Sequence, residues 1–407
     1  MKKRGLALLI VPALALVAAL GSSGGYRATE ATAAAGEATY HRLEVGKVHE
    51  YRAESPHPYG RGVRDTVRSA GAKFIRVHFV DFELAAGDSL VVSSADGTES
   101  WTYEGRGPNG DGDFWSFAVK GDTARLDLRS AQGNSNAYGY RIVGVGHGNV
   151  DLHAKPSGPT PEVLCGTDGR EDVACRPETD SVEPQVARLL FTSGNSQYVC
   201  TGELIRGSNA NTMITNYHCF STQTEVNTVQ ATFDYQRATC TGAINSGTTY
   251  AGGTLLKTNS DAASRKKGGG GGLDYTLLTL QGNPEATYGE LVPTTKAVAV
   301  GDPIWFVQHP GGNQKKVGYW EDGAKTVRCN VDTINATYGT SAAGSQIGYA
   351  CDSEGGSSGS AITDPATGNV IALHHYGGVD RSQCLNSGTW MRTICADAGS
   401  LLQCASN

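Results

Sequence analysis

Ser358 is the first candidate for a reactive side chain, and it lies in residues 354–362, which read EGGSSGSAI. Glycine adopts backbone conformations that other residues rarely reach, so this stretch can form a sharp turn that exposes the Ser358 hydroxyl. The same turn would aim the backbone N–H groups of Gly356 and Ser358 at one point, as a candidate oxyanion hole. Taken alone, the stretch is equally typical of a surface loop. The serine therefore needs a partner that can accept its proton.

His218 is the candidate base for this serine. It follows the apolar stretch 211–217 (NTMITNY) and directly precedes Cys219. Cys200 opens another strand-like stretch, CTGELI, a short distance upstream. A Cys200–Cys219 disulfide would tie the histidine loop to the neighbouring strand. A lone histidine is more often structural, but this pairing of Cys-Thr-Gly with His-Cys favours a catalytic role.

Asp274 is the candidate carboxylate, in the apolar stretch 272–278 (GLDYTLL). Burying a carboxylate is costly unless it is paired, and an imidazole is a suitable partner. The order His218, Asp274, Ser358 along the chain is one of the known orders of such triads. These three residues together predict hydrolysis through an acyl-enzyme, with the carboxylate holding the imidazole in one tautomer.

These segments resemble the chymotrypsin-like (trypsin-like) serine proteases, and within them the bacterial lysyl and glutamyl endopeptidases. The resemblance spans about residues 160–400. It rests on CTG at 200–202, YHC at 217–219, DYTLL at 274–278, HP at 309–310 and GSSGS at 356–360. It implies an all-β fold with two orthogonal six-stranded β-barrels, the triad in the cleft between them, and a serine-type endopeptidase (hydrolase) activity.

All ten cysteines lie after residue 160. An even number in an exported chain indicates disulfides rather than metal ligands. The stretch 233–236 (FDYQ) ahead of Cys240 is most similar to the lysyl endopeptidases. Besides Cys200–Cys219, that resemblance implies Cys175–Cys240 and Cys165–Cys384, which leaves Cys329–Cys351 and Cys395–Cys404.

The chain differs at two positions from the families that it resembles. Ser357 stands where animal digestive proteases carry an aspartate that forms an ion pair on activation, so activation of that kind is not expected. Residues 386–390 (NSGTW) contain no acid, although lysyl endopeptidases hold the substrate lysine with an aspartate there. The cleavage specificity therefore cannot be carried over from the resemblance.

Asp352, His374 and Gly377 are the candidate substrate-binding residues. Asp352 precedes the nucleophile where trypsin-like enzymes place the acid that binds Arg or Lys, and it favours a basic P1 side chain (the residue before the cleaved bond). Glutamyl endopeptidases use a pocket histidine, which His374 matches. If backbone N–H groups occupy Asp352, we expect His374 to select acidic residues instead. The sequence alone favours the basic preference.

The N-terminus is typical of a secretory signal peptide, residues 1–21, with Lys2, Lys3 and Arg4 before an apolar stretch from Leu6 to Leu20. The stretch is shorter than the ~20 residues that a membrane span requires. We therefore expect a secreted protein, extracellular or periplasmic, without a membrane span. Residues 22–39 are rich in Ala, Gly, Ser and Thr and predict a spacer.

Residues 40–152 show short alternating stretches such as 74–79 (FIRVHF), which predict a small antiparallel β-sandwich. Together with residues 112–117 (GDFWSF), this stretch resembles the CUB-like modules of some secreted proteases. Residues 153–164 contain three prolines and predict a linker before the protease domain, residues 165–407. The loop aspartates (Asp81, Asp88, Asp111, Asp113) are expected to form turns, with calcium ligation as the alternative.

With 407 residues, 39% of them hydrophobic, the chain is long enough for two folded units. The net charge of −6 and the lack of a long basic tract give no support for a nucleic-acid partner. We expect a monomer that acts on protein or peptide substrates without a cofactor or metal. Of the adjacent pair His374 and His375, one ring is expected in a pocket and the other in solvent. The main alternative function is a non-catalytic protease homologue that acts as a binding protein.

Overall fold

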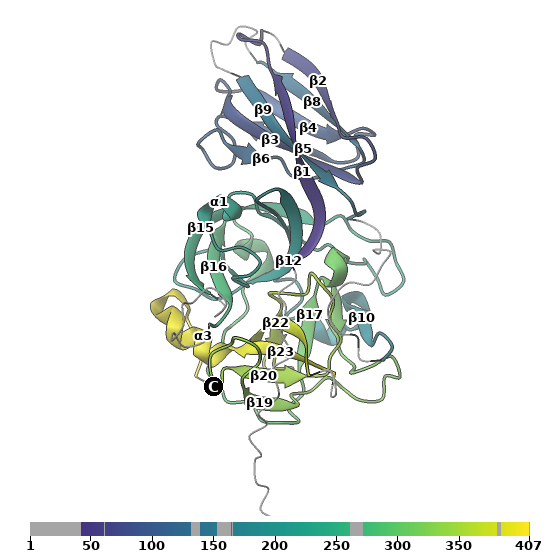
Figure 1. Ribbon diagram of the computed structural model, residues 1–407, viewed down its shortest axis with the longest axis vertical. Coiled ribbons are helices and arrows are strands. Elements are labelled where there is room, and N and C mark those ends of the chain that lie inside the picture. The colour runs from purple at the N-terminus through teal and green to yellow at the C-terminus, as the bar shows by residue number, and fades with distance from the viewer. Residues whose placement is uncertain are drawn as a thin grey trace, which may run out of the picture. The chain divides into compact units, whose positions relative to one another are not determined.

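The computed structural model describes residues 42–60, 62–131, 139–152, 164, 166–260, 272–380 and 384–406. The expected signal peptide (1–21), the spacer (22–39), Cys165 and all of the expected linker except Leu164 lie outside these ranges. Strands form most of the regular structure, and the helices are short (Figure 1). The predicted all-β class is confirmed. No helix in the described ranges is long and apolar enough to cross a membrane.

The N-terminal strands β1–β9 form two antiparallel layers, here called the N-terminal sandwich. One layer contains β1, β9, β3, β6 and β7, and the other has the order β2-β8-β4-β5. The alternation predicted for residues 74–79 is confirmed, because Ile75, Val77 and Phe79 are 0% exposed and belong to one core cluster. The strands are β1 Leu43–Glu54, β2 Gly62–Arg68, β3 Phe74–Glu83, β4 Ser89–Ser94, β5 Ser100–Glu104, β6 Phe114–Trp115, β7 Val119–Lys120, β8 Thr123–Arg129 and β9 Gly139–Gly148.

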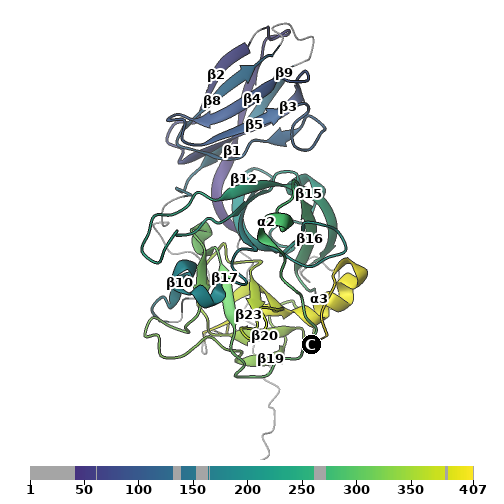
Figure 2. The ribbon, with the colours of Figure 1, turned by 180° about the vertical axis from the view of Figure 1, so that it is seen from behind.

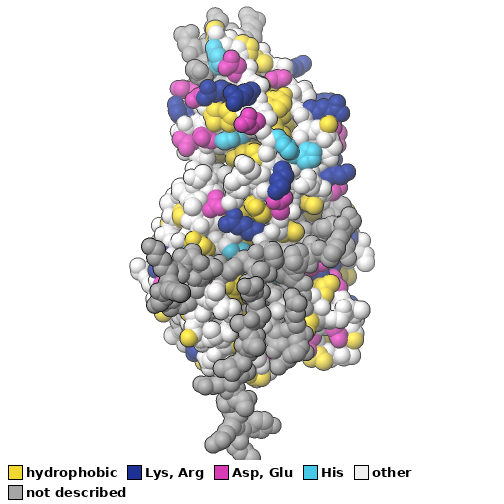
Figure 3. Space-filling model, in the orientation of Figure 1, with side chains coloured by type: hydrophobic (Ala, Val, Ile, Leu, Met, Phe, Trp, Pro, Cys, Tyr) yellow, Lys and Arg dark blue, Asp and Glu magenta, His cyan; other side chains and the backbone are white. Residues whose placement is uncertain are grey.

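The loop aspartates of the N-terminal sandwich have protein partners. Asp88 is buried and accepts hydrogen bonds from the Tyr59 hydroxyl at 2.6 Å and the Ala131 N–H at 2.8 Å. Asp113 contacts the His78 ring at 2.7 Å. Asp111 Oδ1 accepts the Asp113 N–H at 3.0 Å, a local contact that fits the expected role of such aspartates in turns. On the face that Figure 3 shows, acidic and basic side chains are mixed over this part of the molecule.

The next strands form a closed six-stranded barrel, here called the first barrel. Its path is β11-β14-β15-β16-β13-β12, and an additional β11–β12 pairing closes it. In Figure 2 the strands curve around and α2 lies in front of the ring. The elements are β11 Val186–Ser193, β12 Ser196–Leu204, β13 Thr212–Thr215, α1 Gln223–Val226, β14 Gln230–Phe233, β15 Thr248–Asn259, β16 Tyr275–Leu280 and α2 Glu285–Tyr288.

The C-terminal strands and β10, which precedes the first barrel in the chain, form a sheet with the order β10-β18-β17-β21-β22-β23-β20-β19. It has eight strands rather than the expected six, because the short β10 and β19 extend its two edges. Its elements are β10 Arg170–Asp172, β17 Trp305–Gln308, β18 Lys316–Gly318, β19 Thr333–Ala336, β20 Gln346–Tyr349, β21 Ala361–Thr363, β22 Val370–Asp380, β23 Leu385–Trp390 and α3 Met391–Ala398, with single 3-10 turns at Val173–Cys175, Pro177–Thr179, Pro310–Gly312 and Gly399–Leu401.

Disulfides connect segments that the strands alone would leave loosely joined. Cys200, in β12, is bonded to Cys219, which directly follows His218. The expected Cys165–Cys384 bridge involves Cys165, which lies outside the described residues, and it stays a prediction. The other bridges are Cys175–Cys240, Cys329–Cys351 and Cys395–Cys404, which are the pairs expected from the sequence.

Candidate active site

The loop after β13 carries His218 to the edge of the first barrel. β13 pairs with β12 on one side and with β16 on the other, so residues 216–219 leave the barrel at a fixed point. The Cys200–Cys219 disulfide anchors the loop to β12 immediately after His218. The His218 side chain is 6% exposed, so the barrel holds its ring in a largely buried position.

Asp274 lies directly before β16 and faces this histidine. Its Oδ2 is 2.7 Å from His218 Nδ1, and its Oδ1 accepts the His218 backbone N–H at 2.9 Å. The Asn216 amide donates to the Asp274 carbonyl at 2.9 Å. Asp274 has a φ of 51°, in the left-handed region that Asp tolerates better than most residues. The carboxylate therefore binds both the ring and the backbone of His218.

Burial alone would raise the pKa of Asp274, which is 1% exposed. The charge of His218 and the hydrogen bonds from His218 and His375 outweigh that effect and lower the pKa to about 2. Asp274 is thus an anion near neutral pH. An anion in this position holds the proton of the neutral imidazole on Nδ1 and leaves Nε2 to accept another proton.

His375 is a further partner of Asp274, and its position differs from the one expected from the sequence. One histidine of the pair at 374–375 was expected in solvent, but His374 is 0% and His375 3% exposed. His375 Nδ1 lies 3.2 Å from Asp274 Oδ2, and its Nε2 lies 2.5 Å from Gln346 Oε1. The pairing register of β22 with β23 also shifts between His374 and Tyr376. Neither ring is left to face solvent.

Ser358 lies in a tight turn between residues 354 and 360. The Ser357 N–H donates to the Glu354 carbonyl at 2.9 Å, and the Ser360 N–H donates to the Ser357 carbonyl at 3.1 Å. Gly359 has a φ of 89°, and a Cβ at this position would lie 2.3 Å from the Thr201 carbonyl oxygen. A glycine is therefore required here both for its conformation and for the close approach of β12.

Thr201 connects the Ser358 turn to the first barrel. Its N–H donates to the Ser358 carbonyl at 2.9 Å, and its hydroxyl donates to the Gly356 carbonyl at 2.8 Å. The adjacent disulfide sulfur of Cys219 lies 3.9 Å from the same Ser358 carbonyl oxygen. The Cys-Thr-Gly motif thus brings the turn that carries Ser358 next to the loop that carries His218.

The peptide bond between Gly355 and Gly356 has a defined orientation. The Gly355 carbonyl accepts a hydrogen bond from the Gly311 N–H at 2.8 Å. In a trans peptide the C=O and N–H point in opposite directions, so the Gly356 N–H points away from Gly311. Gly356 itself has a φ of 99°, and a Cβ there would lie 2.8 Å from the Gly312 nitrogen. This backbone geometry is compatible with the expected oxyanion hole of Gly356 and Ser358.

Residues outside the Ser358 segment also form hydrogen bonds that hold the turn around Ser358. The buried Ser357 hydroxyl donates to Gln308 Oε1 at 2.6 Å, and Gln308 Nε2 donates to the Asp352 carbonyl at 2.9 Å. The His309 N–H donates to the Thr201 hydroxyl at 3.0 Å. From the sequence, His309 was expected only as part of the His-Pro motif, and Gln308 was not expected to have a role. An apolar strand that ends in Gln-His-Pro was the available signal.

The Asp352 carboxylate is buried and already bound by another part of the protein. It is 0% exposed, and its Oδ2 accepts the Gly169 backbone N–H at 2.6 Å. The charge of Asp352 also acts on the neighbouring buried Arg170, whose guanidinium is held by Asp168 and Glu354. The expectation that Asp352 binds a basic substrate side chain is therefore not supported by its surroundings.

His374 and Gly377 both lie on β22. The His374 carbonyl accepts the Gly359 N–H at 3.0 Å, and its N–H donates to the Ser360 carbonyl at 2.9 Å. His374 is thus attached to the residues that directly follow Ser358. Its ring Nδ1 lies 2.7 Å from the Tyr349 hydroxyl, and its ring centroid lies 4.6 Å from that of Phe306. Gly377 is half-buried, three residues further along the strand.

Cys200, His218 and Cys219 bring candidate metal-ligand atoms within 4.8 Å of one another. Both sulfur atoms belong to one disulfide, however, and a disulfide sulfur is not the thiolate that binds a metal. We interpret this group as a structural bridge beside the histidine rather than a metal site.

The buried His375 makes stability depend on pH. Burial lowers the pKa of His375 from 6.5 to about 4, although Asp274 acts in the opposite direction. Between these values the unfolded chain binds a proton that the folded protein does not. We therefore expect the free energy of unfolding to fall as the pH is lowered from 6.5 to about 4, because the unfolded chain gains a proton at this group before the folded protein does.

Urea unfolding of the wild type and of His375→Gln at pH values between 7 and 4 measures this effect. The variant should lose less stability across this range, because one buried histidine no longer titrates. The carboxylate Asp274 adds a further loss below its ordinary pKa of 3.8, toward about 2, in both proteins. Parallel pH profiles for the two proteins would contradict the assignment.

The chain is similar to several known proteins. The family model described as lysyl endopeptidase, C-terminal domain, matches residues 167–389. A curated relative from Plasmopara viticola, "Secreted RxLR effector protein 73", is 27% identical over 348 residues, which cover 80% of this chain and 82% of that protein. That name describes the relative as a secreted effector.

Solved structures with similar folds include the active form of the Rv3671c protease from M. tuberculosis, with 13% identity and a TM-score of 0.41 over 62% of this chain and 96% of that one. A Glu endopeptidase in complex with MPD has 17% identity and a TM-score of 0.40 over 58% of this chain and 99% of that one. The family match covers more than half of the chain and contains His218, Asp274 and Ser358. The chain therefore belongs to the family of the lysyl endopeptidase C-terminal domain.

Proposed function

We propose that this protein is an exported serine endopeptidase in which Ser358 is the nucleophile, His218 the general base and Asp274 the residue that orients His218. The observation that carries the proposal is the 2.7 Å contact between His218 Nδ1 and Asp274 Oδ2. It occurs beside a disulfide that brings Cys219 within 3.9 Å of the Ser358 carbonyl. Export is supported by the N-terminal sequence pattern and the disulfides, and by a relative that is named as secreted.

In the proposed reaction, Ser358 Oγ attacks the carbonyl carbon of the substrate while its proton moves to His218 Nε2. The backbone N–H groups of Gly356 and Ser358 stabilise the negative oxygen of the tetrahedral intermediate. His218 then gives the proton to the leaving amine, and an acyl-enzyme forms on Ser358. A water molecule, deprotonated by His218, hydrolyses this ester and regenerates the serine.

We further propose two domains, with residues 40–152 as a CUB-like β-sandwich and residues 165–407 as the protease domain. The two-layer arrangement of β1–β9 supports the first assignment, and the family match within residues 167–389 supports the second. Residues 1–21 would be the signal peptide, residues 22–39 a spacer and residues 153–164 the linker.

Labelling with a fluorophosphonate tests the proposed activity. The reagent reacts with an activated serine, so the modified peptide should contain Ser358, and peptide hydrolysis should stop in parallel. A second candidate is a non-catalytic binding protein, which the relative named as an effector favours. Purified protein that neither reacts with the reagent nor cleaves a broad peptide library would support that second candidate and exclude the protease.

The surroundings of Asp352 and His374 favour an acidic P1 residue over the basic one suggested by the sequence. Asp352 accepts a hydrogen bond from the Gly169 backbone N–H, which occupies part of its hydrogen-bonding capacity. Its negative charge also interacts with the positive charge of Arg170. If the Tyr349 hydroxyl donates to His374 Nδ1, the proton of the neutral ring lies on Nε2. An Nε2–H group can donate to a substrate carboxylate.

Buried hydroxyl groups next to these residues support the same preference. Among the described residues, Ser353 Oγ and Ser387 Oγ are buried without a hydrogen-bond partner. Ser353 directly follows Asp352, and Ser387 pairs with Tyr376 two positions after His374. Buried hydroxyls without partners are uncommon because each loses its bonds to water. A substrate carboxylate would supply the acceptor that such groups require.

We expect substrates that differ only at P1 to be cleaved faster with Glu than with Lys. His374→Gln should reduce kcat/KM for the Glu substrate roughly 10- to 100-fold, the range of a charge-assisted hydrogen bond. Hydrolysis of a substrate with Ala at P1 is the control and should change little. Faster cleavage after Lys that is lost in Asp352→Asn would overturn the acidic preference and restore the basic one.

A further inference from the structure

Strand β1 belongs to the N-terminal sandwich and to the first barrel at the same time. Residues 46–54 of β1 pair with β9 of the sandwich. Residues 43–47 pair with β12 of the barrel, where Leu43 is opposite Val199 and Lys47 is opposite Ser196. In Figure 1, β1 runs from the sandwich to β12. One strand therefore joins the two sets of strands by backbone hydrogen bonds.

Arg42, which directly precedes β1, reaches the loop of the proposed catalytic histidine. Its Nε donates to the His218 backbone carbonyl, and its Nη1 donates to Ser193 Oγ at 2.7 Å. The same guanidinium forms an ion pair with Glu225 at 3.5 Å and lies 5.5 Å from the centre of the Tyr198 ring. The side chain is 28% exposed, so it lies largely within the protein.

Glu225 holds the other end of the same loop. Its Oε2 accepts the N–H groups of Ser221 at 2.9 Å and Thr222 at 3.2 Å, and its Oε1 accepts the Ser193 hydroxyl at 2.6 Å. Arg42 and Glu225 therefore fix the backbone between residues 218 and 222 from both ends, and their own contact connects the two ends. Hydrogen bonds that involve charged groups are stronger than neutral ones.

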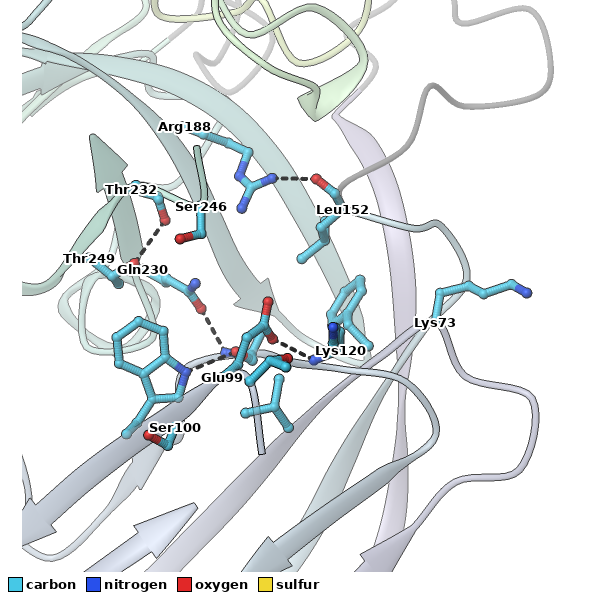
Figure 4. A pocket seen from close by; sticks show the side chains of 16 residues that line it. Lys73, Glu99, Ser100, Lys120, Leu152, Arg188, Gln230, Thr232, Ser246 and Thr249 are labelled. Atoms are coloured by element: carbon cyan, nitrogen blue, oxygen red, sulfur yellow. Dashed lines mark hydrogen bonds between the residues drawn. The ribbon is translucent and has the colours of Figure 1, made fainter. Parts of the chain in front are cut away.

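Other contacts show that the sandwich and the barrel share a packed interior. The buried Arg76 donates to the Thr228 carbonyl at 2.7 Å, and the Ala118 N–H donates to Gln230 Oε1 at 2.8 Å. Arg188 donates to the Leu152 carbonyl at 2.8 Å, at the edge of a cavity of about 220 Å³ (Figure 4). One apolar cluster draws on both parts: Val45, Phe74, Ala118, Leu152, Leu190 and Val199.

Removal of the N-terminal strands would expose these groups. The edge of β12 would lose its partner strand, and the apolar cluster would be opened to water. Arg188 and Gln230 would lose their partners on the sandwich side. Buried polar groups that lose a partner carry a large free-energy cost. We therefore expect the N-terminal sandwich and the first barrel to stay joined.

We propose that Arg42 is a positioning residue for His218, and that the N-terminal sandwich stays with the protease as a working part of it. The inference rests on the proposed serine-protease function. Arg42 touches neither substrate nor reacting atoms, and it acts by fixing the loop on which His218 is mounted. A displacement of about 1 Å in a reacting group can reduce the rate by about 10²-fold.

Three variants test the role of Arg42. Arg42→Ala should reduce kcat roughly 10- to 100-fold and leave KM nearly unchanged, because the substrate pocket is untouched. Arg42→Lys keeps a charged donor and should restore part of kcat. Arg52→Ala is the matched control, since Arg52 lies on β1, which Arg42 directly precedes, and its side chain is 88% exposed. It should behave as the wild type.

Amide hydrogen exchange separates this inference from the proposed function. Exchange in the peptide that contains residues 218–222 should become faster in Arg42→Ala and stay unchanged in Arg52→Ala. If the wild type neither hydrolyses peptides nor reacts with a fluorophosphonate, the proposed function fails, but exchange still tests the Arg42 contact. Wild-type kcat in Arg42→Ala, or unchanged exchange in this peptide, would overturn the positioning role.

Cleavage of the full-length protein tests the second part of the inference. A recognition site for an unrelated, specific protease is introduced into residues 153–163, and the chain is cut after folding. The two fragments should elute together on gel filtration at low concentration and retain the kcat of the uncut protein. Fragments that separate while the C-terminal one keeps full activity would overturn the permanent role of the N-terminal sandwich.

Discussion

We expect Ser358→Ala to lose peptide hydrolysis by roughly 10⁶-fold, the size of the loss when the serine of a triad is removed. The alanine lacks only the hydroxyl, and the turn around Ser358 is held by backbone hydrogen bonds and by the side chains of Thr201 and Ser357. The Thr201 N–H still reaches the carbonyl of residue 358 in the variant. The fold should therefore survive, with an unfolding midpoint close to that of the wild type.

The measurement is kcat/KM on a peptide substrate, together with mass spectrometry after fluorophosphonate treatment. The variant should show neither turnover nor a covalent adduct. Ser181→Ala, at an exposed serine of the same chain, is the control and should retain both. Undiminished hydrolysis in Ser358→Ala would exclude this serine as the nucleophile.

The second large effect is expected for Asp274→Asn, which should reduce kcat by about 10⁴-fold. Asparagine has nearly the same shape as aspartate, and it tolerates the left-handed φ of 51° at this position. Its amide oxygen can still accept one hydrogen bond from the His218 backbone or ring. Its NH₂ group, however, favours the imidazole tautomer in which Nδ1 is unprotonated, and Nε2 is then unable to accept the proton of Ser358.

The measurement is the full pH profile of kcat/KM for Asp274→Asn. If the wrong tautomer of His218 causes the loss of activity, raising the pH should recover little of it. Asp397→Asn is the matched control, because Asp397 is a partly buried carboxylate that accepts the Tyr275 hydroxyl at 2.5 Å and does not contact His218. That variant should keep most of its activity and lose stability instead. Equal losses of kcat in the two variants would argue against a special role for Asp274.

The fold class and the candidate triad could be predicted from sequence because the relevant signals are local. Alternation of apolar residues predicted strands such as residues 74–79, and glycines at 355, 356 and 359 predicted the turn at Ser358. Asp274 stood out because a carboxylate in an apolar strand requires a partner. Each of these inferences depends on neighbours a few residues away, which the sequence displays directly.

Contacts between distant segments were decided by the tertiary structure. Asp352 meets the Gly169 N–H, 183 residues away, and this contact is the reason that we propose an acidic rather than a basic P1 residue. His375 meets Asp274 across 101 residues, where a solvent-facing ring was expected. Both side chains are buried, so each takes the partner that packing brings within hydrogen-bonding distance, and short-range sequence patterns do not encode that choice.

The contact between Arg42 and the His218 carbonyl spans 176 residues and follows the same rule. The sequence by itself determined which groups can do chemistry, their order along the chain, and the strand patterns that support them. Only the tertiary structure decided which of those groups are already engaged by other parts of the chain. The physical reason is that a buried charge or hydrogen-bonding group must find a partner, and the partner is set by how the strands pack.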